Sequence, residues 1–309
     1  MRRRDFLSIA GMTLLGAWAA PGRAAQGPAS KAPPGEKHDA PAPLRFAVIG
    51  DTGTGDKFQL AVAKQMVAEY ERSPFALVLM LGDNNYRGNF GKQVKAVFET
   101  PYEKLLAQGV RFYATLGNHD QADAAEQMAY PNFNMGGKLH YTFSPAGDLA
   151  EFFTFDSTKI VEAADTSQLD WLEKALGESK ARWKIVYFHH PPFSPGKRHG
   201  DNPILDERLV PILEKGGANV VLTGHEHFFA RMREQNGVNY IISGSGGKIH
   251  TGGILPDPRM VAGNDAIHQF LSVALTPDLF SFSVIGENGA TIYSESIPYA
   301  KAAAAGAAR

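Results

Sequence analysis

The segment Phe75-Ala-Leu-Val-Leu-Met-Leu-Gly-Asp-Asn-Asn-Tyr86 is the part of the chain from which its organisation can be worked out. Its apolar run, residues 75–81, is typical of a buried strand, and Gly82 allows a sharp turn where that strand ends. The carboxylate of Asp83 and the phenol of Tyr86 are therefore expected at one strand tip. Taken alone, this pattern is weak evidence for a site, because most such sequences are ordinary turns in which an aspartate caps backbone amides. The other strand ends distinguish the two interpretations.

Ligand-type side chains follow several predicted strands. In open α/β sheets, binding sites form beyond the carboxyl ends of the strands, so residues at those ends are expected to meet. The tip residues are Asp51, Asp83 with Tyr86, Asn118 with His119, His189, and His225 with His227. Each of these alone is compatible with a turn, a cap or a structural histidine. Their recurrence at five strand tips predicts a metal centre, and a bridging carboxylate with neutral nitrogen and amide ligands suits two metal ions.

Alternating strand and helix patterns predict one mixed α/β domain rather than two domains. The predicted strands are 44–51, 75–81, 110–120, 141–143, 151–155, 183–188, 218–222 and 237–243, and the predicted helices are 59–72, 93–107, 167–177 and 204–215. Ser167 is the expected cap of the third helix, and Gly177 its expected stop. After His268, three strands (269–275, 279–285 and 290–294) joined by turn sequences predict an antiparallel meander.

The composition restricts the class of protein. With 309 residues, 44% of them hydrophobic, and a net charge of −1, the chain is long enough for a sizeable core. The near-neutral charge balance predicts neither nucleic acid nor an anionic membrane as a main partner. No apolar run long enough to span a membrane occurs beyond the first 25 positions. The absence of cysteine excludes disulfides and thiolate metal ligands.

The N-terminus resembles a bacterial twin-arginine export signal. Arg2-Arg-Arg-Asp-Phe-Leu7 precedes a moderately apolar stretch, 9–20, and small residues end at Ala25. We therefore predict a signal peptide at 1–25 and a periplasmic or secreted protein without membrane contact after cleavage. An uncleaved membrane anchor is the alternative. The remaining predicted units are a flexible linker at 26–43, a folded domain at 44–298 and a disordered tail at 299–309.

The strand-tip motifs, taken together, resemble a known family. The motifs are Gly50-Asp-Thr-Gly53, Gly82-Asp-Asn-Asn-Tyr86, Gly117-Asn-His-Asp120, Val186-Tyr-Phe-His189 and Gly224-His-Glu-His227. They are similar, in the same order, to the five motifs of the purple acid phosphatases, in particular the compact, tartrate-resistant type, within the calcineurin-like metallophosphoesterase superfamily. The resemblance implies an αββα sandwich of four layers with mixed sheets and a dinuclear metal site at the carboxyl ends of the strands. It also implies an acid phosphatase that hydrolyses small phosphate monoesters by in-line attack of a metal-bound hydroxide.

The resemblance further implies a role for each site residue. Asp51, Tyr86 and His227 would hold a first metal, expected to be Fe(III), and Asp83 would bridge to a second. Asn118, His189 and His225 would hold that second metal, which would be Fe(II), Zn or Mn. His119 would contact the phosphate, Asp120 would orient His119, and His199 would protonate the leaving group. His190 is the alternative to His189 as a ligand.

Gly53 and Tyr86 favour the ferric phosphatase within the superfamily. Most metallophosphoesterases have Asp-x-His in the first motif, whereas Gly53 occupies the histidine position here and the phenol of Tyr86 can supply the missing ligand. The pKa of a free tyrosine is about 10, so a strong Lewis acid such as Fe(III) is needed to keep it ionised in acid. Two alternatives remain: a phosphodiesterase of cyclic nucleotides or phospholipid head groups, suggested by His189-His190-Pro-Pro, and a non-catalytic metal- or phosphate-binding protein.

Cationic side chains lie in the predicted specificity loops. They are Lys197, Arg198, Lys248 and His250. These groups either meet a phosphate or an acidic leaving group, or form part of a solvated surface.

Overall fold

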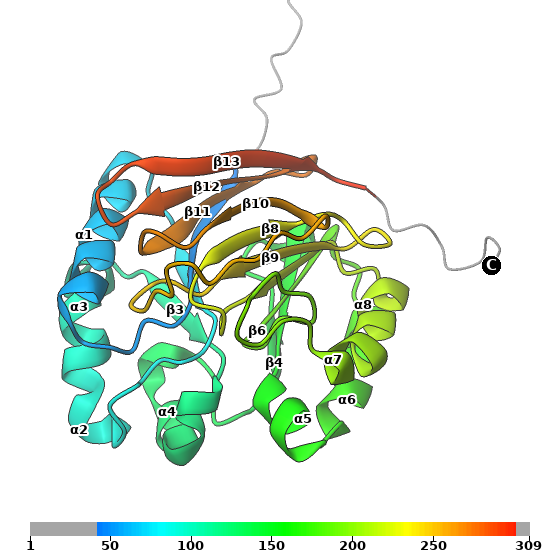
Figure 1. The fold of residues 1–309 in the computed structure, drawn as a ribbon, viewed down its shortest axis with the longest axis horizontal. Coiled ribbons are helices and arrows are strands. Elements are labelled where there is room, and N and C mark those ends of the chain that lie inside the picture. The colour runs from blue at the N-terminus through cyan, green and yellow to red at the C-terminus, as the bar shows by residue number, and fades with distance from the viewer. Residues whose placement is uncertain (1–41, 301–309) are drawn as a thin grey trace, which may run out of the picture. The chain divides into compact units, whose positions relative to one another are not determined.

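The computed structural model describes residues 42–300, which form two β-sheets packed face to face between helices on the outer faces (Figure 1). The predicted four-layer αββα sandwich with mixed sheets is confirmed. The predicted signal peptide lies outside the described residues. Of the predicted linker only residues 42–43 are described, and of the predicted tail only residues 299–300. Within 42–300, no helix has the combined length and apolar character that crossing a membrane requires.

The first sheet has the strand order β13-β12-β11-β1-β2-β3. Its strands are β1 (Leu44–Ile49), β2 (Leu77–Met80), β3 (Arg111–Ala114), β11 (Gln269–Leu275), β12 (Leu279–Gly286) and β13 (Thr291–Pro298). β1, β2 and β3 are parallel, so their carboxyl ends lie at the same edge. The predicted meander β11-β12-β13 continues this sheet, because β11 pairs antiparallel with β1.

The second sheet has the strand order β10-β8-β9-β7-β6-β5-β4. Its strands are β4 (Tyr141–Phe143), β5 (Ala150–Thr154), β6 (Trp183–Phe188), β7 (Val220–Thr223), β8 (Phe229–Met232), β9 (Asn239–Ser243) and β10 (Met260–Asn264). β5, β6, β7 and β9 are parallel. The sequence patterns missed β8 and β10. Every residue of β8 is buried, so buried and exposed residues do not alternate along it. β10 contains Gly263 and Asn264, which disfavour a strand unless a neighbouring strand pairs with them.

The helices cover the outer faces of the two sheets (Figure 1). Against the first sheet lie α1 (Lys57–Arg72), α2 (Phe90–Val94), the π-helical segment η1 (Lys95–Glu99) and α3 (Thr100–Ala107). Against the second lie α5 (Ser157–Ala163), α6 (Ser167–Glu178), α7 (Pro203–Arg208) and α8 (Val210–Gly216). The remaining segments are the 3₁₀ turns η2 (Asn118–Asp123), η3 (Pro131–Phe133) and η4 (Gly147–Leu149), and α4 (Ala124–Ala129).

Two helix predictions need correction, one in its caps and one in its continuity. Thr166, not Ser167, occupies the N-cap of α6. Gly177 lies inside that helix, which ends at Glu178 with Ser179 as its C-cap. The backbone N of Ser167 donates to the Asp165 carboxylate, so an acidic side chain outside the helix satisfies its first amide. The predicted helix 204–215 is divided into α7 and α8 around Leu209.

The core between the sheets is aromatic. Phe46 of β1 meets Phe152 of β5 edge to face, with ring centroids 5.3 Å apart. Phe46 also approaches Phe280 of β12 at 6.1 Å. Aromatic pairs of this kind add about 0.5 to 1.5 kcal/mol beyond the area that they bury. The contact between Phe46 and Phe152 joins the two sheets, whereas Phe280 packs beside Phe46 within the first sheet. The two sheets in turn supply the strand tips of the site.

We predict that Phe152→Ala lowers the free energy of unfolding by about 3 to 5 kcal/mol, because it leaves a cavity between the sheets. Denaturant unfolding of the metal-free protein measures the change. Leu279→Ala is the control, because Leu279 is 40% exposed and its removal leaves no closed cavity. Equal losses in the two variants would contradict the proposed importance of the aromatic core.

Candidate metal centre

The predicted ligand residues converge at one edge of the sandwich. Asp51, Asp83 and Asn118 follow β1, β2 and β3, while His189 and His225 follow β6 and β7. Asp51, Asp83 and His225 have φ values of 58°, 53° and 67°. This left-handed conformation costs on the order of 1 kcal/mol or more for a residue other than glycine, and it persists only where the surroundings enforce it. The strained backbone turns these side chains into the site.

The first cluster contains Asp51, Asp83, Tyr86 and His227. The hydroxyl of Tyr86 donates to Asp51 Oδ1 at 2.9 Å and lies 3.1 Å from His227 Nε2. His227 Nε2 is 3.4 Å from Asp51 Oδ1. Donor atoms that each lie about 2.1 Å from one ion stand about 3 to 3.4 Å apart. The spacing of these donor atoms therefore suits a single metal ion.

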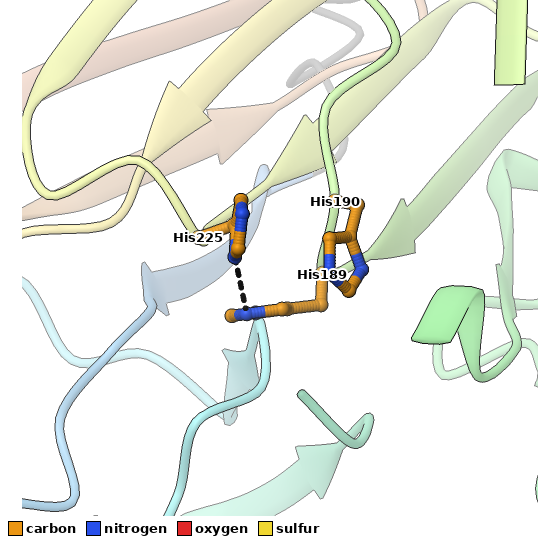
Figure 2. Close-up of side chains that lie close together, drawn as sticks. All are labelled: His189, His190 and His225. Carbon is orange, nitrogen blue, oxygen red and sulfur yellow. Dashed lines mark hydrogen bonds between the residues drawn. The ribbon is translucent and has the colours of Figure 1, made fainter. Parts of the chain in front are cut away.

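The second cluster contains Asn118, His189 and His225 in a triangle. Asn118 Oδ1 lies 3.1 Å from His189 Nε2 and 3.2 Å from His225 Nδ1, and those two nitrogens are 3.2 Å apart. Figure 2 shows His189 and His225 facing one another from neighbouring strand ends. The Nδ1 of His189 lies 2.8 Å from the Leu81 carbonyl oxygen, to which it donates, so its Nε2 keeps a lone pair for a metal.

Asp83 lies between the two clusters. Its Oδ1 is 3.4 Å from His189 Nε2 of the second cluster, and its carboxylate also belongs to the first cluster with Asp51 and His227. The backbone N of His119 donates to the same Oδ1 at 3.0 Å. A carboxylate in this position can contribute one oxygen to each of two ions.

His190 lies close to the second cluster but has other partners. Its ligand atom is within 4.8 Å of those of His189 and His225, and Figure 2 shows the three side chains together. However, His190 Nδ1 is 3.0 Å from Ser157 Oγ, and the His190 backbone N donates to the same oxygen. His189, in contrast, is within 3.4 Å of both Asn118 and Asp83. The geometry favours His189 as the ligand.

The electrostatics of the site favour the binding of metal ions. Burial raises the pKa of Asp51 to about 8, and the negative charge of Asp83 adds to this effect. In residues 42–300, Asp51 and Asp83 form ion pairs with histidines and with no lysine or arginine. Burial lowers the pKa of His227 to about 4 and lowers the pKa of His225 further still, which keeps their lone pairs free. Buried carboxylates with imidazole neighbours fit metal ions, which supply the balancing charge.

The Tyr86 loop packs tightly against Gly53. The backbone N of Gly53 donates to the Asp83 carbonyl at 3.1 Å, and the backbone N of Tyr86 donates to the Gly53 carbonyl at 2.9 Å. A Cβ atom at Gly53 would overlap the backbone of Asn84 and Asn85. A side chain at position 53 is therefore incompatible with this loop, which explains why glycine there and a phenol at position 86 occur together.

The resemblance implies that Asp120 orients His119, but the hydrogen bonds of Asp120 in the described residues go to other groups. Its buried carboxylate accepts hydrogen bonds from the backbone N atoms of Gly117, Asn84 and Asn85 at 2.8, 3.0 and 3.0 Å. No hydrogen bond between Asp120 and His119 is found within the described part of the chain. Burial raises the pKa of Asp120 to about 7, with Asp83 contributing. Asp120 thus holds the loop after β2 against the loop after β3.

The two remaining predicted residues lie at the mouth of the site. The exposed ring of His119 has its centroid 4.7 Å from that of Tyr86. The ring of His199 has its centroid 4.3 Å from that of His225, beside the second cluster. His199 Nδ1 is also 3.5 Å from Glu226 Oε1, a buried carboxylate that accepts from Ser194 Oγ at 3.0 Å.

Glu226 had no assigned role in the sequence interpretation, and Lys248 was assigned only to a predicted specificity loop. Glu226 is the central residue of the His-Glu-His motif, and its inward direction could not be read from the sequence. The Nζ of Lys248 lies 3.5 Å from the centroid of the Tyr86 ring and brings a positive charge to the first cluster. Lys248 follows the glycine-rich segment after β9, and this position predicted that it lies in a loop near the site.

These features define a class: a two-metal centre at the strand tips of a double-sheet sandwich, of the kind that phosphoesterases use. The family model for calcineurin-like phosphoesterases matches residues 44–229, and the chain belongs to that family. Purple acid phosphatase 17 of Arabidopsis thaliana is 30% identical over 278 residues, covering 79% of this chain and 82% of that one. Tartrate-resistant acid phosphatase type 5 of Oryctolagus cuniculus is 28% identical and covers 66% of this chain and 73% of that one. The family predicted from the motifs is confirmed.

Solved structures share the fold at lower sequence identity. Purple acid phosphatase PPD1 from yellow lupin seeds superposes with a TM-score of 0.69 and 17% identity, covering 82% of this chain and 53% of that one. GAP50, the anchor in the inner membrane complex of Plasmodium, superposes with a TM-score of 0.73 and 20% identity, covering 85% of this chain and 91% of that one. At these identities the likeness concerns the fold alone. Family membership and the two ligand clusters together indicate a site for two metal ions.

We predict that Asp120→Asn lowers the free energy of unfolding by at least about 2 kcal/mol, because the amide group of the new side chain would face backbone N–H donors. Urea unfolding of the metal-free protein measures this loss. Asp148→Asn, at an exposed position, is the matched control and is expected to change stability little. If the two variants were equally stable, Asp120 would not hold the loop in place.

Proposed function

We propose that this protein is a secreted, dinuclear-metal acid phosphatase that hydrolyses small phosphate monoesters. The observation that carries the proposal is the position of Asp83 between two ligand clusters. Two ions held by one shared carboxylate can together bind oxygen atoms of a single phosphoryl group. The acid phosphatase names of the relatives support the same activity.

In this proposal each cluster holds one ion. Asp51, Tyr86 and His227 would hold Fe(III), and Asp83 would be shared with the second ion. Asn118, His189 and His225 would hold that ion, which would be Fe(II), Zn or Mn. When bound, the ions supply Lewis acidity that lowers the pKa of a water molecule and offsets charge on the phosphoryl oxygens.

The protein's own groups do the remaining work. His119, which is exposed at the mouth, would donate a hydrogen bond to a phosphoryl oxygen. His199 would deliver a proton to the leaving alkoxide, because its ring lies against His225 of the second cluster. Glu226 lies beside Nδ1 of His199, which leaves Nε2 as the nitrogen available to the substrate.

The place of action is proposed from the N-terminal segment. The twin-arginine pattern of residues 1–25 supports export to the periplasm or beyond the cell. This export route carries folded proteins, so the metal centre would be assembled before export.

We expect the metal-replete protein to contain two metal ions per chain and to hydrolyse para-nitrophenyl phosphate fastest at acidic pH. Bis-para-nitrophenyl phosphate, a diester, should be hydrolysed more slowly. Asp83→Asn should lower kcat/KM for the monoester by at least about a hundredfold, because a ligand shared by both ions is lost. Metal analysis and pH–rate profiles measure these properties, with Asp148→Asn as the control.

Other results would favour other activities. Faster hydrolysis of the diester would favour the phosphodiesterase alternative. An optimum well above neutrality would contradict the acid phosphatase, and full metal binding without turnover of either ester would favour a non-catalytic protein.

A phenolate on Fe(III) absorbs visible light, so the isolated protein should be coloured. Tyr86→Phe should remove that absorption band while activity is largely retained. Tyr130→Phe is the control, because the hydroxyl of Tyr130 donates to Glu99 away from both clusters. A colourless protein that contains only zinc would contradict the assignment of Fe(III).

A further inference from the structure

Two loops enclose a pocket of about 380 Å³ beside the proposed metal centre. We call it the loop pocket; its lining includes Lys197, Arg198, Phe228, His250 and Gly252–Gly253. The backbone N of Lys197 donates to the Gly253 carbonyl at 2.8 Å, and the backbone N of Leu255 donates to the Pro195 carbonyl at 2.9 Å. These bonds join the loops, so the walls of the pocket have a defined position.

The loop pocket adjoins the proposed ligands. The ring of His250 has its centroid 4.4 Å from that of His227, and the backbone N of His250 donates to the His227 carbonyl at 3.1 Å. On the other side, Arg198 is followed directly by His199, whose ring lies against His225. An alcohol that leaves past His199 therefore has the loop pocket next to it.

The charged groups around the loop pocket are mainly cationic. Lys197 and Arg198 are exposed, and the ion pairs found in residues 42–300 include neither of them. The one carboxylate in the lining, Glu226, is buried and already occupied by Ser194 and His199. The two free cations are consequently available to a ligand.

A second pocket, of about 490 Å³, lies on the other side of His199 and has a different character. Its lining includes the carboxylates of Glu162 and Asp201 as well as Arg198. Asp201 is paired with Arg259 at 2.8 Å, whereas no ion pair of Glu162 is found in the described residues. There Glu162 opposes an anion that Arg198 attracts, whereas the loop pocket has two exposed cations and a single, buried carboxylate. The loop pocket therefore suits an anionic leaving group better.

We propose that the loop pocket binds a second anionic group on the leaving alcohol, and that the enzyme prefers phosphate monoesters carrying a further phosphate. This inference rests on the proposed function, because it concerns the substrate of the same site. Arg198 can donate two parallel hydrogen bonds to a phosphate, and Lys197 adds a point charge. Lys197 and Arg198 are thus specificity-determining residues rather than catalytic ones.

The test compares fructose 6-phosphate with fructose 1,6-bisphosphate, which differ by one phosphate. The metal-replete wild type should show a kcat/KM at least about tenfold higher for the bisphosphate, chiefly through KM, since charge-assisted hydrogen bonds contribute about 1.5 to 3 kcal/mol. K197A/R198A should reduce that ratio to about one. K95A/K104A removes the same number of charges from the exposed side of η1 and α3 and should keep the wild-type ratio.

Calorimetric binding of the two sugars to the metal-replete protein separates this inference from the proposed function. If neither sugar is hydrolysed, but the wild type binds the bisphosphate more tightly and K197A/R198A does not, the anion pocket stands and the phosphatase proposal fails. Equal binding and equal turnover of the two sugars by the wild type would overturn the inference. So would a double variant that keeps the wild-type preference.

Discussion

Two buried carboxylates lie side by side at the edge of this fold without a lysine or arginine partner among the described residues. Burial and mutual repulsion raise the pKa of Asp51 to about 8, so the negative charge at this site needs a positive partner. The side chains placed around Asp51 and Asp83 are imidazoles, an amide and a phenol. The balancing charge is therefore left to metal ions, and the surrounding structure serves to hold the donor atoms in position.

Local strain and close packing together hold those donors. Asp51, Asp83 and His225 have positive φ values, and such conformations persist only when neighbouring segments enforce them. Gly53 permits the close approach that carries Tyr86 into the first cluster, and the buried carboxylate of Asp120 ties the loops after β2 and β3 together. The precision of the site thus depends on hydrogen bonds between segments far apart in the sequence.

The same arrangement explains how an anion can enter a site built around carboxylates. Neutral ligands keep the net charge low once the metals are bound, and cationic side chains surround the entrance. Lys248 lies over the ring of Tyr86, and Lys197 with Arg198 flanks His199. The proposed acid phosphatase activity and the proposed preference for doubly anionic substrates follow from this separation: metals act on the phosphoryl group, and loop cations bind the leaving group.

The sequence by itself determined the alternating α/β pattern, the family and the set of residues at the strand tips, because apolar runs and turn residues are local properties. The tertiary structure alone decided the rest. β8 and β10 form because neighbouring strands pair with them. The preference for His189 over His190 comes from contacts with Asn118, Asp83 and Leu81, and the role of Asp120 from amides near position 84. Such contacts join residues that are separated by tens of positions along the chain, so no local pattern records them.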